Sequence, residues 1–334
     1  MLKRHTLLLL ILSVSASPRE HISAAEHPLK PEGRVAFTEG PAWHPSGNVY
    51  FSDIENNRIM RRDPSGKIHT YRTPSGRANG LMFDSQGRLI ACEGHREGGN
   101  RRVTRTELDG SITILTDNFN GHLYNSPNDL AIDSKGFIYF TDPRYRERKG
   151  MEIVDADNQP IEGVYRLDPE SLEVTQIITH EVARPNGIAI SSNDKYLIVA
   201  DNANDNPGDN RKLWRFNLNP DGTVDPDSQK LLFDWGTDRG PDGICIDIND
   251  TIYATAGFNH PNPPAQTADQ YKAGVYLISI EGEHLDTIPV PMDLITNCTF
   301  GGPDLKTLYI TAGHTLWSTP VETPGKLHWP KGAR

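Results

Sequence analysis

Six oxygen-bearing side chains recur at one position of a repeated pattern, and these residues could bind an ion together. Each precedes or opens an alternating, β-rich run that is followed by a turn and a return strand. The six are Glu39, Asn79, Asn128, Asn186, Asp242 and Asn297. Carboxylate and amide oxygens without His or thiolate suit a hard cation, Ca²⁺ before Mg²⁺ or Mn²⁺, and two carboxylates would neutralise a divalent ion.

Turn chemistry is the alternative explanation for these residues. Asn-Gly and Asp-Gly are common turn dipeptides, and Asn and Asp tolerate left-handed backbone angles. This alternative accounts for any single copy. Glu39 argues against it for the whole set, because Glu is not a favoured turn residue, and Gly is replaced after Asn128 and after Asn297.

The elements that must position these residues are β-hairpins. In the clearest copy, Ser126–Tyr145, an alternating run meets a turn at Asp133–Gly136 and a return strand at Phe137–Thr141. With this copy the sequence contains six, at spacings of roughly 40–58 residues and with about four strands in each unit, which is typical of propeller blades. The sequence therefore predicts an all-β, six-bladed β-propeller whose six polar residues surround one end of a central channel.

Ring closure can be predicted from the two ends of the repeat. The last copy has only three strands before a C-terminal tail, and Arg34–Thr38 is a strand without a blade of its own. We expect this N-terminal strand to complete the sixth blade and remove an exposed edge. The propeller is then one domain, residues 34–321, followed by a C-terminal tail at 322–334.

The N-terminus has the three parts of a secretory leader. Lys3-Arg4 precede the apolar run Leu7–Leu12, and Ala16 ends a small-residue cleavage pattern. We expect a signal peptide at 1–16, with Ala24 or Ala25 as a second cleavage option, and a lead-in at 17–33. Because no later segment is apolar enough to span a bilayer, a soluble secreted or periplasmic protein is expected.

Net charge and topology limit the kinds of partner that the protein is expected to bind. The formal net charge is −10, and it becomes more negative when the basic leader is removed, so nucleic acid is an unfavourable partner. A closed propeller has no free strand edge that requires a partner, so a monomer is expected.

Three cysteines, Cys92, Cys245 and Cys298, each lie inside a predicted strand. Their number is odd and their spacing matches no metal motif, so buried thiols are the expected state. A Cys245–Cys298 bridge between neighbouring blades is the alternative, although the two lie at different strand positions.

Four segments of the sequence resemble the signature segments of the senescence marker protein/gluconolactonase/regucalcin-like family. They are Glu39–Trp43, Ser126–Asp129, Arg184–Gly187 and Gly240–Gly243. Phe140–Pro143 and Asn100–Val103 are similar to the gluconolactonase branch in particular. The resemblance implies a propeller with one catalytic divalent cation on the axis. By position, Glu39, Asn186 and Asp242 match the family's metal ligands, and Asn128 matches the channel Asn that faces the substrate and water on the metal.

The resemblance implies hydrolysis of a sugar lactone such as gluconolactone, with a cation that is Ca²⁺ by preference and Zn²⁺, Mn²⁺ or Mg²⁺ otherwise. Asp242 is the candidate base and Asn128 would orient water or substrate. Asp129 and Arg102 are candidate substrate-binding residues. Turn capping is the alternative for Asp129, and an exposed loop is the alternative for Arg102 and its neighbours Glu93 and His95.

Two other functions stay open from the sequence. A non-catalytic propeller could hold a structural cation and bind a partner or glycan at its rim. A metal-dependent esterase or phosphoesterase could use the same site.

Overall fold

The computed structural model describes residues 27–145 and 148–327. This part of the chain consists of β-strands, turns and loops, and it contains no helix. Accordingly, no helix in these ranges could cross a membrane. The predicted signal peptide, residues 1–16, lies outside the described residues.

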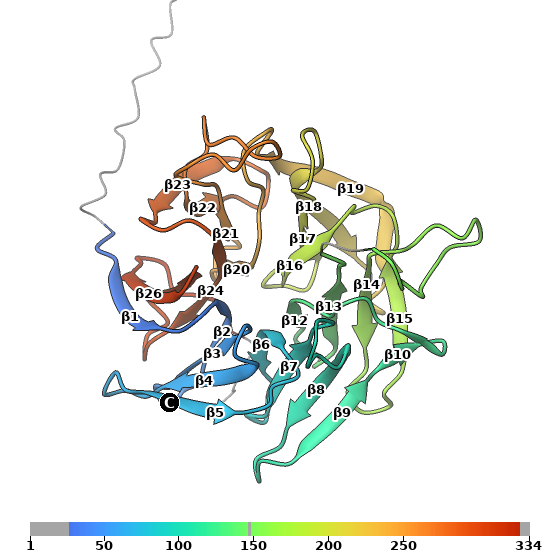
Figure 1. The fold of residues 1–334 in the computed structure, drawn as a ribbon, viewed down its shortest axis with the longest axis horizontal. Coiled ribbons are helices and arrows are strands. Elements are labelled where there is room, and N and C mark those ends of the chain that lie inside the picture. The colour runs from blue at the N-terminus through green and yellow to red at the C-terminus, as the bar shows by residue number, and fades with distance from the viewer. Residues whose placement is uncertain (1–26, 146–147, 328–334) are drawn as a thin grey trace, which may run out of the picture.

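Six four-stranded antiparallel sheets are arranged around a central axis, which confirms the predicted six-bladed propeller (Figure 1). Within each blade the first strand lies nearest the axis, and the other three lie side by side outward from it. The first strands contact one another in sequence around the ring, β2 to β6, β12, β16, β20, β24 and back to β2.

The first three blades each contain four strands, and the return strand predicted at Phe137–Thr141 in the third blade is observed at Ile138–Asp142. Their strands are β2 (Thr38–Trp43), β3 (Val49–Asp53), β4 (Arg58–Arg62) and β5 (Ile68–Arg72); β6 (Ala78–Phe83), β7 (Leu89–Glu93), β8 (Arg102–Thr106) and β9 (Ile112–Thr116); and β12 (Leu130–Ile132), β13 (Ile138–Asp142), β14 (Gly163–Leu167) and β15 (Val174–Ile178). A short hairpin separates the second and third blades, formed by β10 (Asn118–Phe119) and β11 (His122–Leu123).

The last three blades repeat the plan. Their strands are β16 (Pro185–Ile190), β17 (Tyr196–Asn202), β18 (Arg211–Leu218) and β19 (Val224–Asp234); β20 (Ile244–Ile246), β21 (Ile252–Ala256), β22 (Gly274–Ile278) and β23 (His284–Pro289); and β24 (Ile295–Gly301), β25 (Thr307–Ala312), β26 (Thr315–Pro320) and β1 (Lys30–Arg34).

The N-terminal strand β1 forms the outer strand of the sixth blade, where it pairs antiparallel with β26. Its bounds, Lys30–Arg34, differ from the predicted Arg34–Thr38, and its first four residues belong to the predicted lead-in, 17–33. The sequence Lys-Pro-Glu-Gly-Arg has little strand propensity of its own, so its pairing depends on the edge offered by β26.

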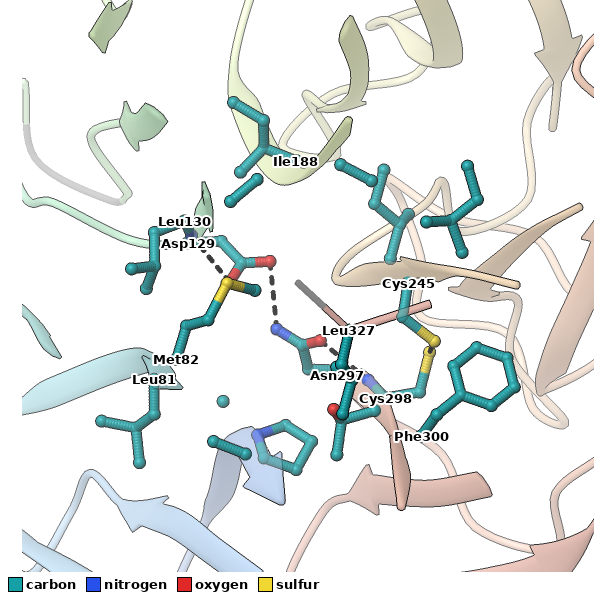
Figure 2. Close-up of a pocket in the computed structure, with 18 of the residues that line it drawn as sticks. Leu81, Met82, Asp129, Leu130, Ile188, Cys245, Asn297, Cys298, Phe300 and Leu327 are labelled. Atoms are coloured by element: carbon teal, nitrogen blue, oxygen red, sulfur yellow. Dashed lines mark hydrogen bonds between the residues drawn. The ribbon is translucent and has the colours of Figure 1, made fainter. Parts of the chain in front are cut away.

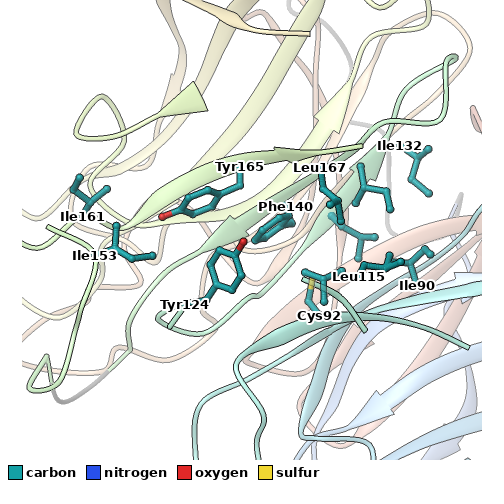
Figure 3. Close-up of a cluster of buried hydrophobic side chains, with 13 residues drawn as sticks. Ile90, Cys92, Leu115, Tyr124, Ile132, Phe140, Ile153, Ile161, Tyr165 and Leu167 are labelled. Atoms are coloured by element: carbon teal, nitrogen blue, oxygen red, sulfur yellow. The ribbon is translucent and has the colours of Figure 1, made fainter. Parts of the chain in front are cut away.

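The apolar core lies between blades. Six clusters of buried side chains each join two neighbouring blades around the ring. Figure 3 shows the cluster between the second and third blades, in which the rings of Phe140 and Tyr165 stack with centroids 5.3 Å apart. Because the strands alternate, each blade buries apolar side chains on both faces, and this packing holds the innermost strands at fixed spacing.

The C-terminal tail packs across the ring. The backbone N–H of Ile248 donates to Pro324 O at 3.0 Å, and Lys326 Nζ donates to Ser191 O at 2.6 Å. These contacts lie at the end of the innermost strands opposite to Asn186 and Asp242. The described part of the predicted tail, residues 322–327, therefore covers that end of the channel.

Candidate active site

Five of the six repeated polar residues are buried at the starts of the innermost strands. Their exposed fractions lie between 3 and 6 %, and the residues are Glu39, Asn128, Asn186, Asp242 and Asn297. Surface turns would leave such side chains in solvent. Asn79, the sixth, is half-buried.

The glycines that follow these residues permit close packing of adjacent blades. Gly187 and Gly243 do not have positive φ values. A Cβ on Gly187 would lie 2.3 Å from the carbonyl oxygen of Asp242, and one on Gly243 would lie 2.1 Å from Asn297 Cγ. The turn explanation is therefore wrong at these two positions, because glycine is required there for space rather than for a left-handed backbone.

An Asp at the end of the second strand fixes the approach to the innermost strand in three blades. The carboxylate of Asp142 accepts hydrogen bonds from the backbone N–H groups of Asn125 at 2.7 Å and Ser126 at 2.6 Å. Asp53 and Asp201 make the same pair of bonds in their own blades. Each Asp thus fixes the backbone two and three residues before Glu39, Asn128 or Asn186.

Hydroxyl groups on the second strands link Asn79 and Asn186 to the preceding blade. Thr141 Oγ1 donates to the carbonyl oxygen of Asn186 at 2.8 Å, and Ser52 Oγ donates to that of Asn79 at 2.7 Å. The positions of the polar side chains are therefore set by neighbouring blades as well as by their own strands.

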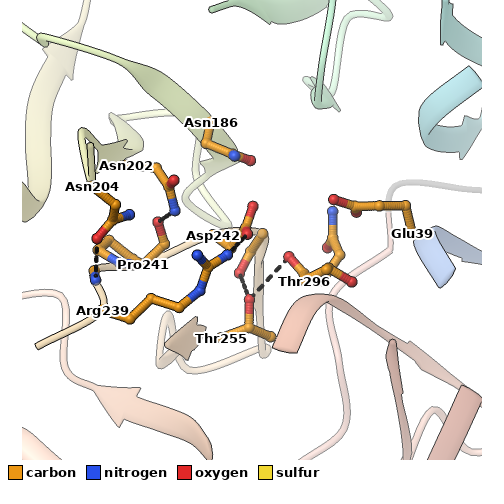
Figure 4. Close-up of polar contacts among 12 residues, drawn as sticks. Glu39, Asn186, Asn202, Asn204, Arg239, Pro241, Asp242, Thr255 and Thr296 are labelled. Carbon is orange, nitrogen blue, oxygen red and sulfur yellow. Dashed lines mark hydrogen bonds and ion pairs between the residues drawn. The ribbon is translucent and has the colours of Figure 1, made fainter. Parts of the chain in front are cut away.

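Glu39 is a buried carboxylate close to other carboxylates. Its Oε2 accepts a hydrogen bond from the backbone N–H of Gly40 at 3.0 Å. Burial raises the pKa of Glu39 well above its usual value, and the charges of Asp242 and Asp129 raise it further. Figure 4 shows Glu39, Asn186 and Asp242 pointing into a common space.

Asp242 lies between a guanidinium group and an amide. Arg239 Nη2 is 2.5 Å from Asp242 Oδ2 (Figure 4). Burial raises the pKa of Asp242 to about 6, while the ion pair with Arg239 and a hydrogen bond with Asn186 oppose that increase. The Asn186 amide Nδ2 also lies 2.5 Å from the hydroxyl oxygen of Tyr145.

Asp129 extends across the axis of the propeller. Asn297 Nδ2, from the sixth blade, donates to Asp129 Oδ2, from the third, at 3.2 Å (Figure 2). Burial raises the pKa of Asp129 to about 7, and the Asn297 bond partly offsets this. The turn-capping alternative does not account for a contact across the ring, and together these two side chains form a floor below the channel mouth.

The donor set suits a divalent cation. Glu39, Asp129 and Asp242 bring three buried carboxylates together near one guanidinium, that of Arg239. Buried carboxylates with incomplete charge compensation are unfavourable, and a cation would relieve this repulsion. In the described part of the chain no cluster of three His, Cys, Asp or Glu has metal-site geometry. The amide oxygen of Asn186 would therefore have to join Glu39 and Asp242 as a ligand.

Arg102 and its neighbours form a separate network. Arg102 Nε is 2.8 Å from Glu93 Oε2, and Arg72 also pairs with Glu93. Glu93 is fully buried, so the exposed-loop alternative is wrong for this residue. His95 is half-buried, and burial together with Arg144 and Arg96 lowers its pKa to about 4.

Several residues around Asp242 were not predicted. Arg239 and Tyr145 contact the candidate ligands directly. Asn204 Oδ1 accepts a hydrogen bond from Gly240 N at 2.9 Å, and Asn202 Nδ2 donates to Pro241 O at 2.5 Å. Asn202 and Asn204 thus hold the loop that carries Asp242. In the sequence, the one indication of these contacts is that Arg239 directly precedes the Gly240–Gly243 segment.

A profile of the SMP-30/Gluconolactonase/LRE-like region matches residues 37–314. A gluconolactonase of Zymomonas mobilis is 28% identical over 314 residues, which cover 87% of this chain and 80% of the relative. The lactonase drp35 of Staphylococcus epidermidis is 29% identical over 219 residues, covering 64% of this chain and 62% of the relative.

Solved structures agree with the fold. A gluconolactonase from Xanthomonas campestris superposes with a TM-score of 0.72 at 26% identity, covering 90% of this chain and 91% of that chain. The calcium-binding protein regucalcin from Agrobacterium tumefaciens superposes with a TM-score of 0.69 at 16% identity, covering 90% and 95%, and so supports the fold alone. The profile match spans most of the sequence, and this chain belongs to the SMP-30/Gluconolactonase/LRE-like family.

Proposed function

We propose that this protein hydrolyses a sugar lactone such as gluconolactone, with a divalent cation held by Glu39, Asn186 and Asp242. The observation that carries the proposal is the convergence of these three buried side chains at one end of the axis (Figure 4). Their oxygen donors favour Ca²⁺, with Mg²⁺, Mn²⁺ and Zn²⁺ as alternatives. Relatives that are named gluconolactonase and lactonase support the reaction class.

The cation, when bound, supplies a Lewis acid that polarises the lactone carbonyl and stabilises the charge developing on its oxygen. The carboxylate of Asp242 accepts a proton from water as the water oxygen attacks the carbonyl carbon. When the bond to the ring oxygen breaks, the same group returns the proton to that oxygen. The product is the open hydroxy acid, and Asp242 ends in its starting state.

Four further residues support this chemistry. Asn128 is held in the channel through its backbone, which donates to Thr141 O at 2.9 Å and accepts from Gly80 N at 2.7 Å, and its amide can orient substrate. Arg239 orients the Asp242 carboxylate through the 2.5 Å ion pair to Oδ2. The Asp129–Asn297 pair separates the site from the end of the channel that the tail covers. The substrate therefore enters from the end at which Asn186 and Asp242 lie.

We propose that this activity lies outside the cytoplasm, in the periplasm or the medium, because residues 1–16 have the sequence pattern of a secretory leader. We also propose that the protein is a monomer, because β1 covers the edge of the last blade.

A lactone panel tests the proposed function. Purified protein is assayed on aldonolactones, a simple ester and a phosphoester, before and after chelation, and then with Ca²⁺, Zn²⁺, Mn²⁺ or Mg²⁺ added back. We expect lactone hydrolysis that is lost with chelator and restored best by Ca²⁺. Hydrolysis that survives complete chelation would contradict the cation's role. Metal-dependent melting without turnover of any lactone would instead favour a non-catalytic propeller.

A further inference from the structure

Two cysteines from neighbouring blades lie side by side near the axis. Cys245 is in β20 of the fifth blade and Cys298 is in β24 of the sixth. Their sulfur atoms are 3.2 Å apart, and Figure 2 shows them facing each other among the residues that line a pocket between the innermost strands. This distance is shorter than ordinary contact between two thiol sulfurs, whereas a disulfide requires an S–S length of about 2.0 Å.

The register of the two innermost strands explains this proximity. Gly243 N donates to Thr296 O at 2.6 Å, which sets Gly243 beside Thr296. Two residues further along each strand, Cys245 comes beside Cys298. Because side chains repeat every two residues in a strand, both thiols then project from corresponding positions. The sequence hides this proximity, because Cys245 and Cys298 fall at different positions when they are counted from Asp242 and Asn297.

We propose that Cys245 and Cys298 form a disulfide that ties the innermost strands of the fifth and sixth blades. The oxidant is a low-molecular-weight disulfide of the oxidised glutathione type. The Cys245 thiolate attacks one sulfur of that disulfide and releases one thiolate. The Cys298 thiolate then attacks the Cys245 sulfur and releases the second. One S–S bond forms within the protein, two S–H bonds are lost, and the oxidant is reduced to two thiols.

The surroundings of the pair suit a structural bond. Cys298 is 3 % exposed, whereas Cys245 is half-buried and borders that pocket, so Cys245 is the thiol that an oxidant meets first. The bond would close a long segment of chain, and cross-links over long segments restrict the unfolded state strongly. It would also hold the strand that follows Asp242 against the strand that carries Asn297.

Cys92 supplies an internal control. It is fully buried in the cluster between the second and third blades, and its sulfur lies 3.8 Å from the carbonyl oxygen of Asp129. The odd number of cysteines is thereby explained as one pair and one remaining thiol.

Thiol counting on the full chain tests the proposal. The protein is incubated with oxidised glutathione, denatured, alkylated with iodoacetamide and weighed intact, with a reduced sample treated in parallel. We expect one alkylated cysteine in the oxidised sample and three in the reduced one. Peptide mapping should find Cys245 linked to Cys298 and Cys92 alkylated. Three alkylated cysteines after oxidation overturn the proposal.

Thermal melting tests the stabilising effect of the bond. Reductant should lower the Tm of the oxidised wild type by about 5 °C or more. Cys245→Ser should remove this response, while Cys92→Ser should retain it. If the wild type melts at the same temperature with and without reductant, the bond does not tie the blades and the proposal fails. These readouts do not involve lactone turnover, so they stand or fall separately from the proposed function.

Discussion

At the scale of single residues, Asp242 has two roles that a substitution can separate from folding. It is a candidate ligand and also the proposed proton acceptor. Asp242→Asn keeps the size of the side chain and removes its charge. We expect kcat/KM for lactone to fall by ~10²-fold or more, and cation binding measured by calorimetry to weaken.

The matched control for that variant is Asp133→Asn. Asp133 is also a buried Asp, but its carboxylate accepts hydrogen bonds from Lys135 N and Phe137 N in a hairpin turn. This control should lose stability and keep its activity per folded molecule. Equal turnover in Asp242→Asn and wild type would exclude Asp242 as the base.

Arg239 gives a second prediction at this scale. Its guanidinium places a positive charge 2.5 Å from a candidate ligand oxygen. Arg239→Gln should therefore bind the cation about 10-fold more tightly, since the charge that opposes the ion is removed. Its kcat should fall, because Asp242 loses the group that orients it. Arg239→Lys should bind the cation as the wild type does, and calorimetry with initial rates measures both effects. Weaker cation binding in Arg239→Gln would show that orientation matters more than charge.

Sequence reasoning locates the residues that repeat and misses those that do not. Glu39, Asn186 and Asp242 recur at one register, so their convergence could be predicted from strand periodicity. Arg239 and Tyr145 lie in loops without counterparts in other blades. Their contacts depend on loop paths that no local pattern determines.

At the scale of elements, the spacing between innermost strands is set by glycine. A Cβ on Gly187 would meet backbone atoms of the next blade, the Asp242 carbonyl oxygen at 2.3 Å and Ile244 N at 2.7 Å. Backbone cannot move aside as a flexible side chain can. Gly187→Ala should therefore destabilise the protein by about 2 kcal/mol or more in urea unfolding, and should weaken cation binding.

Gly110→Ala is the control for this variant. Gly110 has a φ of +85° in a turn, and an added Cβ would have no atom within 4 Å. Its substitution should cost about 1 kcal/mol from backbone strain and leave cation affinity unchanged. If both variants lose the same stability, close packing at Gly187 is not what requires glycine.

The buried Asp142, at the end of a second strand, should make the stability of the protein depend on pH. Burial raises the pKa of Asp142 to about 7, although the N–H groups of Asn125 and Ser126 lower it. In the unfolded chain an Asp titrates near pH ~4, so the folded state holds this proton more strongly. The proton on Asp142 therefore contributes fully to the stability of the folded state below pH ~4. This contribution is lost as the pH rises through about 7.

Asp142→Asn removes this titration. The stability of the wild type relative to the variant should decrease between pH 5 and pH 8, as measured by urea unfolding at each pH. Asp109→Asn serves as the control, since Asp109 is exposed in a turn and its hydrogen bonds with Ser111 lower its pKa. A wild-type advantage over Asp142→Asn that grows with pH would mean that the two N–H bonds outweigh burial.

Hairpins could be predicted from the sequence almost to the residue, but β1 could not. Val35, Ala36 and Phe37 have the apolar character of a strand, which explains the predicted bounds. In the structure the N–H groups of Ala36 and Phe37 instead donate to Asp53 Oδ1, both at 3.2 Å. The strand that pairs with β26 contains Glu32, whose carboxylate contacts Arg62 and Ser318. These partners are distant in the sequence, so no local pattern marks the strand.

At the scale of the whole molecule, the propeller depends on the contact between its two ends. β1 supplies the fourth strand of the sixth blade, and the following segment leads directly into β2, which carries Glu39. Val35 N donates to His314 O at 2.9 Å, and Thr38 N donates to Gly313 O at 2.8 Å, so the connection is bonded along its length. β1 thus completes the last blade, and the bonded segment after it leads to one candidate ligand.

Removing β1 should therefore affect stability and the site together. A chain that begins at Val35 leaves the β26 edge unpaired and the entry to Glu39 free at one end. Compared with a chain that begins at His27, it should melt about 5 °C lower or more, bind the cation more weakly in calorimetry, and associate through the exposed edge. Light scattering measures that association. A shorter chain that melts lower but keeps full cation affinity would show that Glu39 is positioned by β3 and the neighbouring blades alone, because Glu39 pairs with Ser52 in that strand.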